Sequence, residues 1–138
     1  MTETRNESAA ATATVVAIPS MLEGGLEARR SSHFGKSPAF ALVDAATGEV
    51  TMITNNPPET GRCRAAAALL ISAGAKAVVV KGIGARPLEV LSDADVTVYL
   101  DESSKTVSEA VAAFSAGTLQ AIKPEEVCAH HHGEDHCS

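Results

Sequence analysis

The most concentrated set of metal-binding side chains lies near the C-terminal end of the sequence. Within ten positions, thiol and imidazole groups occur at Cys128, His130, His131, His132, His136 and Cys137. Thiolate and imidazole are ligands that zinc, copper, nickel and iron–sulfur centres prefer. The spacing lacks the two separated ligand pairs of a zinc finger, and Gly133 argues against a helix. The pattern therefore favours a flexible chelating arm; the alternatives are an expression tag or a polar tail with chance histidines.

A second candidate is His33, which lies in the sequence Ser32-His33-Phe34-Gly35. This motif belongs to the loop after the first predicted strand. Parallel sheets place their ligand sites at the carboxyl ends of the strands, so the imidazole is a candidate ligand for a metal or cofactor. The alternative is an ordinary loop histidine whose ring bonds the backbone.

Cys63 is the third candidate, because Arg62 and Arg64 flank it at the start of a predicted helix. Positive neighbours and a helix N-terminus both favour the thiolate form of a cysteine. The alternative is a small buried hydrophobic residue, which is the commonest role of a free cysteine.

The segment Gly82-Ile83-Gly84 leads from a predicted strand into a helix, with Lys81 and Arg86 beside it. Backbone N–H groups at such a turn suit an anionic ligand. The segment has neither the Lys-Ser/Thr ending of a P-loop nor the third glycine of a dinucleotide fingerprint, so a tight strand-to-helix turn is the alternative.

These candidates must be positioned by a mixed, mostly parallel sheet with helices packed against it. Short β-rich apolar runs predict about five strands, at residues 14–18, 39–43, 50–54, 77–80 and 96–99. The second and third runs form a leading hairpin, after which helices and strands alternate. Helices are predicted over residues 61–73, after Gly84, and from the capping box that begins at Thr106. Residues 19–38 are predicted to form a long loop without regular structure, and such loops are often functional.

Composition limits the kinds of protein that this chain can be. It has 138 residues and a formal net charge of −6, which predicts one domain and argues against nucleic-acid binding. No apolar run approaches the roughly 20 residues that span a bilayer, and the first residues lack a basic signal-peptide region. Three cysteines form an odd set, so we expect reduced thiols and a cytoplasmic location. We expect a disordered segment at 1–12, a folded domain at 13–122 and the chelating arm at 123–138.

Several of these segments together resemble the dinitrogenase iron–molybdenum cofactor biosynthesis family, which includes NifX, NafY and the C-terminal domain of NifB. The resemblance is carried by the Ser32–Gly35 loop, the hairpin, the Asn55-Asn56 turn, the segment 78–84 and the helix from Thr106 to Gly117. It implies a ribonuclease H-like α/β fold without nuclease activity. Members bind or carry iron–sulfur or iron–molybdenum–sulfur clusters and their precursors, and His33 matches the family's candidate ligand. Some members also end in a Cys/His-rich tail.

The leading hypothesis is a non-enzymatic protein that binds, carries or helps to assemble a metal–sulfur cluster. Its partners would be cluster donor and acceptor proteins, and it would be a monomer or a weak homodimer. The expected cofactor-binding residues are Ser32, His33, Phe34, Gly35, Cys63, Gly82 and Gly84, and the expected metal ligands are His33 and the six donors of the arm. A sulfide-bridged cluster is anionic and soft, and it needs a few such ligands together with N–H donors.

Two other functions remain open at this point. The first is a buffer or metallochaperone that binds zinc, nickel or copper through the C-terminal arm alone. The second is a hydrolase that uses the ribonuclease H-like body or a Cys63 thiolate. The sequence has no nucleophile elbow and no paired carboxylates at strand centres, and Asp44 and Asp101 at strand ends are typical turn residues.

Overall fold

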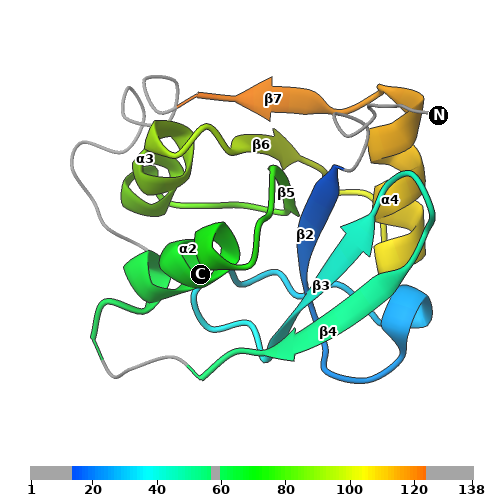
Figure 1. The fold of residues 1–138 in the computed structure, drawn as a ribbon, viewed down its shortest axis with the longest axis horizontal. Helices are drawn as coiled ribbons and strands as arrows, with labels where there is room; N and C mark the ends of the chain where they lie inside the picture. The colour runs from blue at the N-terminus through cyan, green and yellow to red at the C-terminus, as the bar shows by residue number, and fades with distance from the viewer. Residues whose placement is uncertain (1–13, 57–59, 124–138) are drawn as a thin grey trace, which may run out of the picture.

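The computed structural model describes residues 14–56 and 60–123. They form one six-stranded sheet in the order β4-β3-β2-β5-β6-β7 (Figure 1). The strands are β2 (Val15–Ser20), β3 (Ala39–Asp44), β4 (Val50–Thr54), β5 (Ala77–Val80), β6 (Thr97–Leu100) and β7 (Gln120–Ile122). The helices are α2 (Arg62–Ser72), α3 (Ala85–Asp93), α4 (Val107–Ala116) and the short 3₁₀ helix η1 (Gly25–Glu27).

The sheet is mixed, as predicted. Strands β2, β3 and β4 form an antiparallel meander, β2, β5 and β6 are parallel, and β7 returns antiparallel to β6. Because β4 runs in the same direction as β2, the strands β2, β4, β5 and β6 all end at one edge of the sheet. We call this the carboxyl edge. It comprises the described segments that follow these strands and the first turns of the next helices, at residues 21–38, 55–56, 60–65, 81–88 and 101–110.

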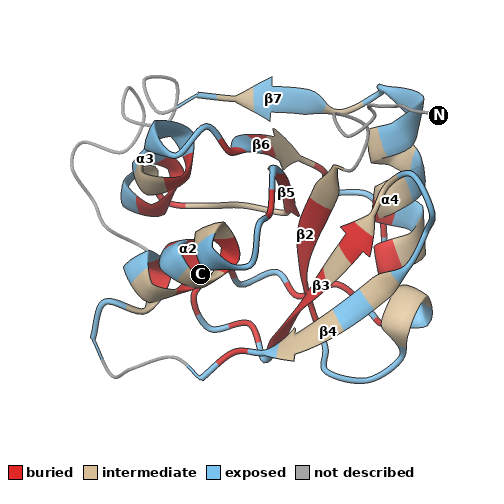
Figure 2. Cartoon of the chain, in the orientation of Figure 1, coloured by how far each residue is buried: buried red, intermediate tan, exposed pale blue. Residues whose placement is uncertain are grey.

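Helices cover both faces of the sheet, because the buried strand residues are apolar on both sides. In β5, Val78 and Val80 belong to one core cluster, and Ala77 and Val79 belong to the other. The first cluster includes the buried residues of α2 together with Leu88 and Leu91 of α3, and the second includes the buried residues of α4 (Figure 2). This three-layer arrangement explains why β5 is a continuous apolar run instead of an alternating one.

The helix boundaries follow the signals in the sequence. Helix α2 is rich in alanine and leucine, and Gly74 just beyond it has φ +88°, a backbone conformation that glycine adopts most easily. Pro87, Leu88 and Leu91 are the buried residues of α3. At the start of α4, the Thr106 hydroxyl accepts from the Glu109 N–H at 3.2 Å, as the capping box predicts.

The structure corrects several details of the sequence analysis. Strand β2 continues through Pro19 to Ser20, whereas the sequence predicted that Pro19 ends it. Pairing with β5 covers only Val16 and Ala17, so Pro19 lies beyond this part of the ladder, and its carbonyl accepts from the Ser31 N–H. A capping box predicts that the Glu109 carboxylate accepts from the N–H of Thr106, whereas in the structure it accepts from the N–H of Lys105.

The number of strands and the structure of the long loop also differ from the prediction. The sheet has a sixth strand, β7, which gives almost no sequence signal because it is three residues long and mostly exposed. The segment predicted to lack structure contains η1, and β-bridges join Arg30 to Ser20 and Arg29 to Thr106. Within the described ranges, no helix is long and apolar enough to cross a membrane. The expected segment 1–12 and arm residues 124–138 lie outside the described residues.

Candidate functional site

The loop with His33 is anchored to the body by the residue that follows the histidine. The Phe34 side chain is fully buried, and its ring centroid lies 5.7 Å from that of Phe40 in β3. Ser32 and His33 themselves are exposed. No residue in the described parts of the chain hydrogen-bonds the His33 ring. The loop therefore holds its backbone against the core while it presents the imidazole at the surface.

Buried polar side chains fix the rest of this loop. Asn55 Nδ2 donates to the Gly35 carbonyl at 3.0 Å and to the Ser37 carbonyl at 2.8 Å. The Ser37 hydroxyl lies 2.7 Å from the carbonyl of Ala39, to which it donates. The Ser31 hydroxyl accepts from the His33 N–H at 3.1 Å. These bonds satisfy loop backbone groups that would otherwise be buried without partners.

The same core cluster brings together three of the segments that the sequence analysis singled out. Phe34, Cys63 in the first turn of α2 and Leu88 in the first turn of α3 all belong to the first cluster. Cys63 is 8% exposed, so it contributes to this core as well as lying at the helix start where the sequence predicted it. Cys63 is disulfide-bonded in the structure, so the expectation of reduced thiols is wrong for this residue. Its predicted role as a cofactor-binding residue stays a prediction.

The glycine bend lies between β5 and α3, as predicted. Gly84 is the N-cap residue of α3 and has no side-chain cap, and Gly82 faces open space where a side chain would project. Ile83 between them packs against the first core cluster. The first N–H groups of a helix have no partner within the helix, so the bend presents backbone donors at the carboxyl edge.

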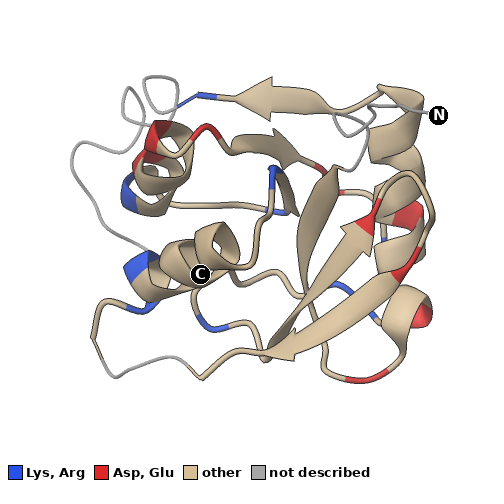
Figure 3. Ribbon diagram, viewed as in Figure 1, with Lys and Arg blue, Asp and Glu red and all other residues tan. Residues whose placement is uncertain are grey.

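Positive charge is concentrated at this edge. Eight of the ten basic side chains in residues 14–56 and 60–123 lie there, together with five of the ten acidic ones. Five of these eight basic side chains lie on the side of the sheet that α2 and α3 cover. The described segments that carry them, 31–38, 60–65 and 81–88, contain no acidic residue. We call these five residues the basic patch: Lys36, Arg62, Arg64, Lys81 and Arg86. Figure 3 shows blue at the first turns of α2 and α3, and red on η1 and α4.

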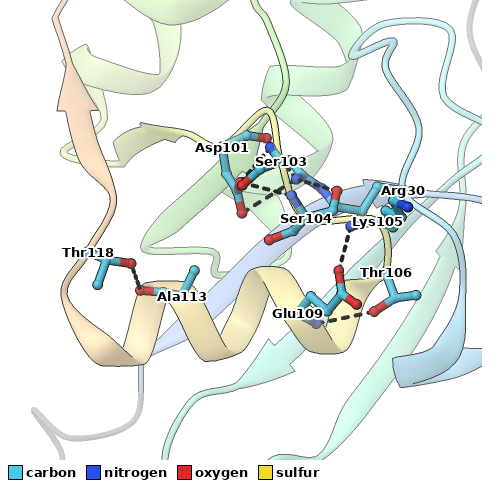
Figure 4. Close-up of polar contacts among 9 residues, drawn as sticks. All are labelled: Arg30, Asp101, Ser103, Ser104, Lys105, Thr106, Glu109, Ala113 and Thr118. Carbon is cyan, nitrogen blue, oxygen red and sulfur yellow. Dashed lines mark hydrogen bonds and ion pairs between the residues drawn. The ribbon is translucent and has the colours of Figure 1, made fainter.

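The sequence did not predict the buried Arg30–Asp101 pair, which connects the loop after β2 to the end of β6 (Figure 4). Arg30 Nη1 donates to the Asp101 carbonyl at 2.7 Å and to the Ser104 carbonyl at 3.3 Å. Its distance to Asp101 Oδ2 is 3.5 Å, and the two side chains are 0% and 2% exposed. Asp101 Oδ1 accepts from the N–H groups of Ser103 and Ser104, which confirms its predicted turn role.

The environment of the pair shifts both pKa values. Burial lowers the pKa of Arg30, although the negative charge of Asp101 opposes this effect. Burial would raise the pKa of Asp101, but hydrogen bonds from Ser104 and Ser103 and the charge of Arg30 outweigh burial and hold it below its usual value. Nε and Nη2 of Arg30 and Oδ2 of Asp101 are buried without hydrogen-bond partners. The pair therefore holds the start of the His33 loop at some electrostatic cost.

A signal for this pair exists in the sequence, but it is weak. Asp101 follows a strand and Arg30 lies in a loop rich in charged residues, 71 positions away. Nothing in the local pattern distinguishes the buried Arg30 from the exposed Arg29 beside it. Only the topology, which places the loop after β2 next to the β6–α4 connection, makes the two groups partners.

The predicted metal ligands of the arm, from Cys128 to Cys137, lie outside the described residues. Within residues 14–56 and 60–123, no group of three or more His, Cys, Asp or Glu side chains could hold a metal ion. In these ranges His33 supplies an imidazole, whereas the sulfur of Cys63 is held in a disulfide.

The fold and the site define a class of protein: an α/β domain that presents a histidine loop, a glycine bend and a basic patch at the carboxyl edge of a mixed sheet. The chain belongs to the dinitrogenase iron-molybdenum cofactor family, whose family model matches residues 14–117. The resemblance inferred from the sequence is therefore confirmed. Membership associates the chain with the accessory proteins of iron–molybdenum cofactor biosynthesis.

Solved structures are similar over most of the chain. The apo form of the orange protein from Desulfovibrio gigas has 26% sequence identity and a TM-score of 0.73, over 80% of this chain and 93% of that one. A putative NifB protein from Thermotoga has 31% identity and a TM-score of 0.65, over 78% of this chain and 92% of that one. No curated protein matches the chain. The structural likeness confirms the predicted α/β fold class.

Proposed function

We propose that this protein binds an anionic metal–sulfur cluster, or a precursor of one, and carries it between a donor and an acceptor protein. The cargo would be an iron–sulfur or iron–molybdenum–sulfur cluster, bound at the carboxyl edge. His33 would supply a ligand, and the backbone of Ser32–Gly35 and of the Gly82–Gly84 bend would surround the cargo. The protein would act as a carrier in the cytoplasm and catalyse no reaction.

The observation that carries this proposal is the position of His33. Its imidazole is exposed, while Phe34 fixes the adjacent backbone to the same core cluster as the first turns of α2 and α3. An exposed donor on a fixed backbone binds a soft metal without a large cost of ordering the loop.

The basic patch and the small number of ligands support the same function. The patch places positive charge where an anionic cluster would bind, in a chain whose net charge is −6. The described body holds no complete set of metal ligands. Incomplete ligation suits a carrier, because open coordination positions allow the cargo to pass to the next protein.

The proposal is tested by anaerobic reconstitution of the full chain with iron, sulfide and molybdate. Iron, molybdenum and acid-labile sulfide are then measured in the desalted protein. We expect bound metal and sulfide in the wild type and a several-fold loss in His33→Ala. A colourless product without sulfide, in the wild type as in His33→Ala, would rule out the proposal.

Paired lysine variants test the contribution of the basic patch. Lys36→Gln removes one positive charge beside His33, and Lys76→Gln removes one just before β5, at the opposite edge of the sheet. We expect Lys36→Gln to lower cluster retention, because the positive charge that it removes lies close to the proposed site and attracts an anionic cluster. A charge at a greater distance is screened by salt. Lys76→Gln should retain the cluster as the wild type does.

A second function, divalent-metal buffering by the C-terminal arm, is favoured by the absence of a complete ligand set within the described ranges. Deletion of residues 124–138 separates the two functions. If the arm alone binds metal, the deletion removes all metal affinity. If the carboxyl edge binds the cargo, part of the cluster binding survives the deletion and is lost on adding His33→Ala.

A further inference from the structure

The sheet has two edge strands, β4 and β7, and they differ in how well they resist pairing with another chain (Figure 1). Proteins usually protect an edge strand by a short length, a charged side chain, a proline or a bulge. Strand β7 is short, with three residues. Strand β4 has five residues, contains no charged side chain and no proline, and keeps an uninterrupted register with β3. The edge of β4 therefore lacks the usual protection.

The hydrogen bonds at both ends of β4 show which of its backbone groups face away from β3. The Asp44 N–H donates to the Glu49 carbonyl at 2.9 Å, and the Asn55 N–H donates to the Pro38 carbonyl at 3.0 Å. Hydrogen-bonded residues alternate along an antiparallel ladder, so every second residue from Glu49 to Asn55 bonds to β3. The three residues between them direct their N–H and C=O groups to the open edge, where no described residue bonds them: Val50, Met52 and Thr54.

This row of open groups is complementary to an identical row. When two copies of β4 meet antiparallel with Met52 beside Met52, Val50 of each copy faces Thr54 of the other. These three pairs exchange about six hydrogen bonds, because each hydrogen-bonded pair of an antiparallel ladder exchanges two. On the opposite face of the strand, Thr51 of each copy faces Ile53 of the other. Cross-strand pairs of β-branched residues stabilise sheets.

Charges at the two ends of β4 favour the same arrangement. The turn before β4, residues 44–49, carries Asp44 and Glu49 and no basic residue. At the other end, Asn55 binds the carbonyl groups on both sides of Lys36, and the described segments 31–38 and 55–56 contain no acidic residue. Antiparallel pairing brings the acidic start of each strand to the basic end of the other. A second copy of this chain thus fits the edge in both hydrogen bonding and charge.

We propose that β4 is a dimerisation edge, at which a second copy of this chain pairs antiparallel about Met52 and joins the two sheets into one. The contact is a single strand edge, so the association is weak and reversible. Because β4 ends at the carboxyl edge, the antiparallel arrangement points the carboxyl edges of the two copies in opposite directions. The inference does not depend on the proposed function, since no cluster takes part in the pairing.

NMR of the full chain, from about 20 μM to about 1 mM and without added metal, tests the pairing directly. We expect the amide protons of Val50, Met52 and Thr54 to shift downfield and to exchange several-fold more slowly as the concentration rises. Those of Thr51 and Ile53 should change little, because they already bond to β3. In a mixture of labelled and unlabelled chains, the Hα of Thr51 should show an NOE to the Hα of Ile53 in the other copy, since non-hydrogen-bonded pairs lie closest.

Two lysine variants, compared by sedimentation velocity, test which edge is used. Thr51→Lys adds a charge to the β4 edge, and Gln120→Lys adds the same charge to the β7 edge; both side chains are exposed, so both variants should fold. Thr51→Lys should raise the dissociation constant about tenfold or more, because it places an ammonium group beside Ile53 of the other copy. Gln120→Lys should leave the dissociation constant unchanged. A non-reducing gel identifies any disulfide-linked dimers, which are removed before the measurement.

A charge swap tests the orientation of the two copies. Glu49→Lys and Lys36→Glu should each weaken the dimer by up to about tenfold, and the double variant should recover most of the affinity, because it restores opposite charges at both ends. A double variant as weak as the product of the two single effects would overturn the antiparallel arrangement.

Other results of these measurements would also overturn the proposal. Spectra that do not change with concentration show that no second copy pairs at the edge. If the amides of Val50, Met52 and Thr54 are then protected at every concentration, a segment of the same chain covers the edge. Concentration-dependent changes at Gln120–Ile122, or equal effects of the two lysine variants, show that the interface lies elsewhere. Cluster binding is measured separately by the reconstitution, so the two failures are distinguishable.

Discussion

Asp101→Asn is the substitution for which the structure predicts the clearest loss of stability. The asparagine carbonyl can still accept from the Ser103 and Ser104 N–H groups, so the turn after β6 keeps its hydrogen bonds. The amide NH₂ then replaces Oδ2, which lies 3.5 Å from Arg30 Nη1. A donor faces a donor, and the buried guanidinium loses its counter-charge.

The size of the effect follows from the burial of the pair. Removing one partner of a buried ion pair costs about 3–5 kcal/mol. We expect about 3 kcal/mol here, since Arg30 keeps its bonds to two carbonyl groups. For a chain of this length, that loss lowers Tm by roughly 10 °C. The start of the His33 loop should loosen as well, because Arg30 bridges to Ser20 in β2.

Urea unfolding followed by circular dichroism measures this loss, because the chain has no tryptophan for fluorescence. Asp44→Asn is a matched control. Asp44 Oδ1 also accepts from two turn N–H groups, those of Ala46 and Thr47, but it has no buried arginine beside it. We expect the control to change the free energy of unfolding by less than about 0.5 kcal/mol.

A double-mutant cycle separates the ion pair from other effects of the substitution. Arg30→Met alone leaves the Asp101 carboxylate buried, whereas the double variant with Asp101→Asn leaves no buried charge. The double variant should therefore lose about 1–3 kcal/mol less than the sum of the single losses. Strict additivity, or a loss below about 1 kcal/mol in Asp101→Asn, would refute the reasoning.

Three further predictions test the other contacts around the loop. The pKa of Asp101 is lower in the folded protein than its usual 3.8, so the unfolded state binds more protons as the pH falls. The stability advantage of the wild type over Asp101→Asn should therefore be constant above about pH 5 and disappear as the pH falls below 3.8. Urea titrations at each pH measure this difference. Phe34→Ala should cost about 3–5 kcal/mol in urea unfolding, because the ring is fully buried; an unchanged midpoint would contradict the anchoring role. Asn55→Asp should cost about 2 kcal/mol or more in the same assay, because a carboxylate replaces the NH₂ that donates to two loop carbonyl groups, whereas the exposed neighbour Asn56→Asp should cost little.

Much of the fold was predictable because its signals are local. The apolar run at Ala77–Val80 predicts a strand that is covered on both faces, and the Thr106–Glu109 box predicts the start of α4. The short strand β7 and the continuation of β2 through Pro19 were not predictable. Strand β7 has too few buried residues to form a hydrophobic pattern. The extent of β2 depends on which strand each of its ends pairs with, and this is set by the tertiary structure.

The site was predictable in part. The sequence placed His33 and the glycine bend at the carboxyl ends of strands and Cys63 at the start of a helix, and the structure shows that these segments contribute to one core cluster. Nothing in the sequence indicated that the side chains of Asn55 and Ser37 fix the loop through hydrogen bonds to backbone carbonyl groups. These are ordinary turn residues in the sequence, and their bonds run to backbone groups up to 20 positions away.

The sequence by itself determined the chemistry that is available: one imidazole in the body, a Cys/His arm, a net charge of −6 and the alternation of strands and helices. These depend on residue type and short spacing alone. The tertiary structure decided which groups meet, because pairing of distant segments sets their neighbours. It buried Arg30 against Asp101, turned Phe34 into the core so that His33 faces outward, and gathered five basic side chains along one side of the sheet.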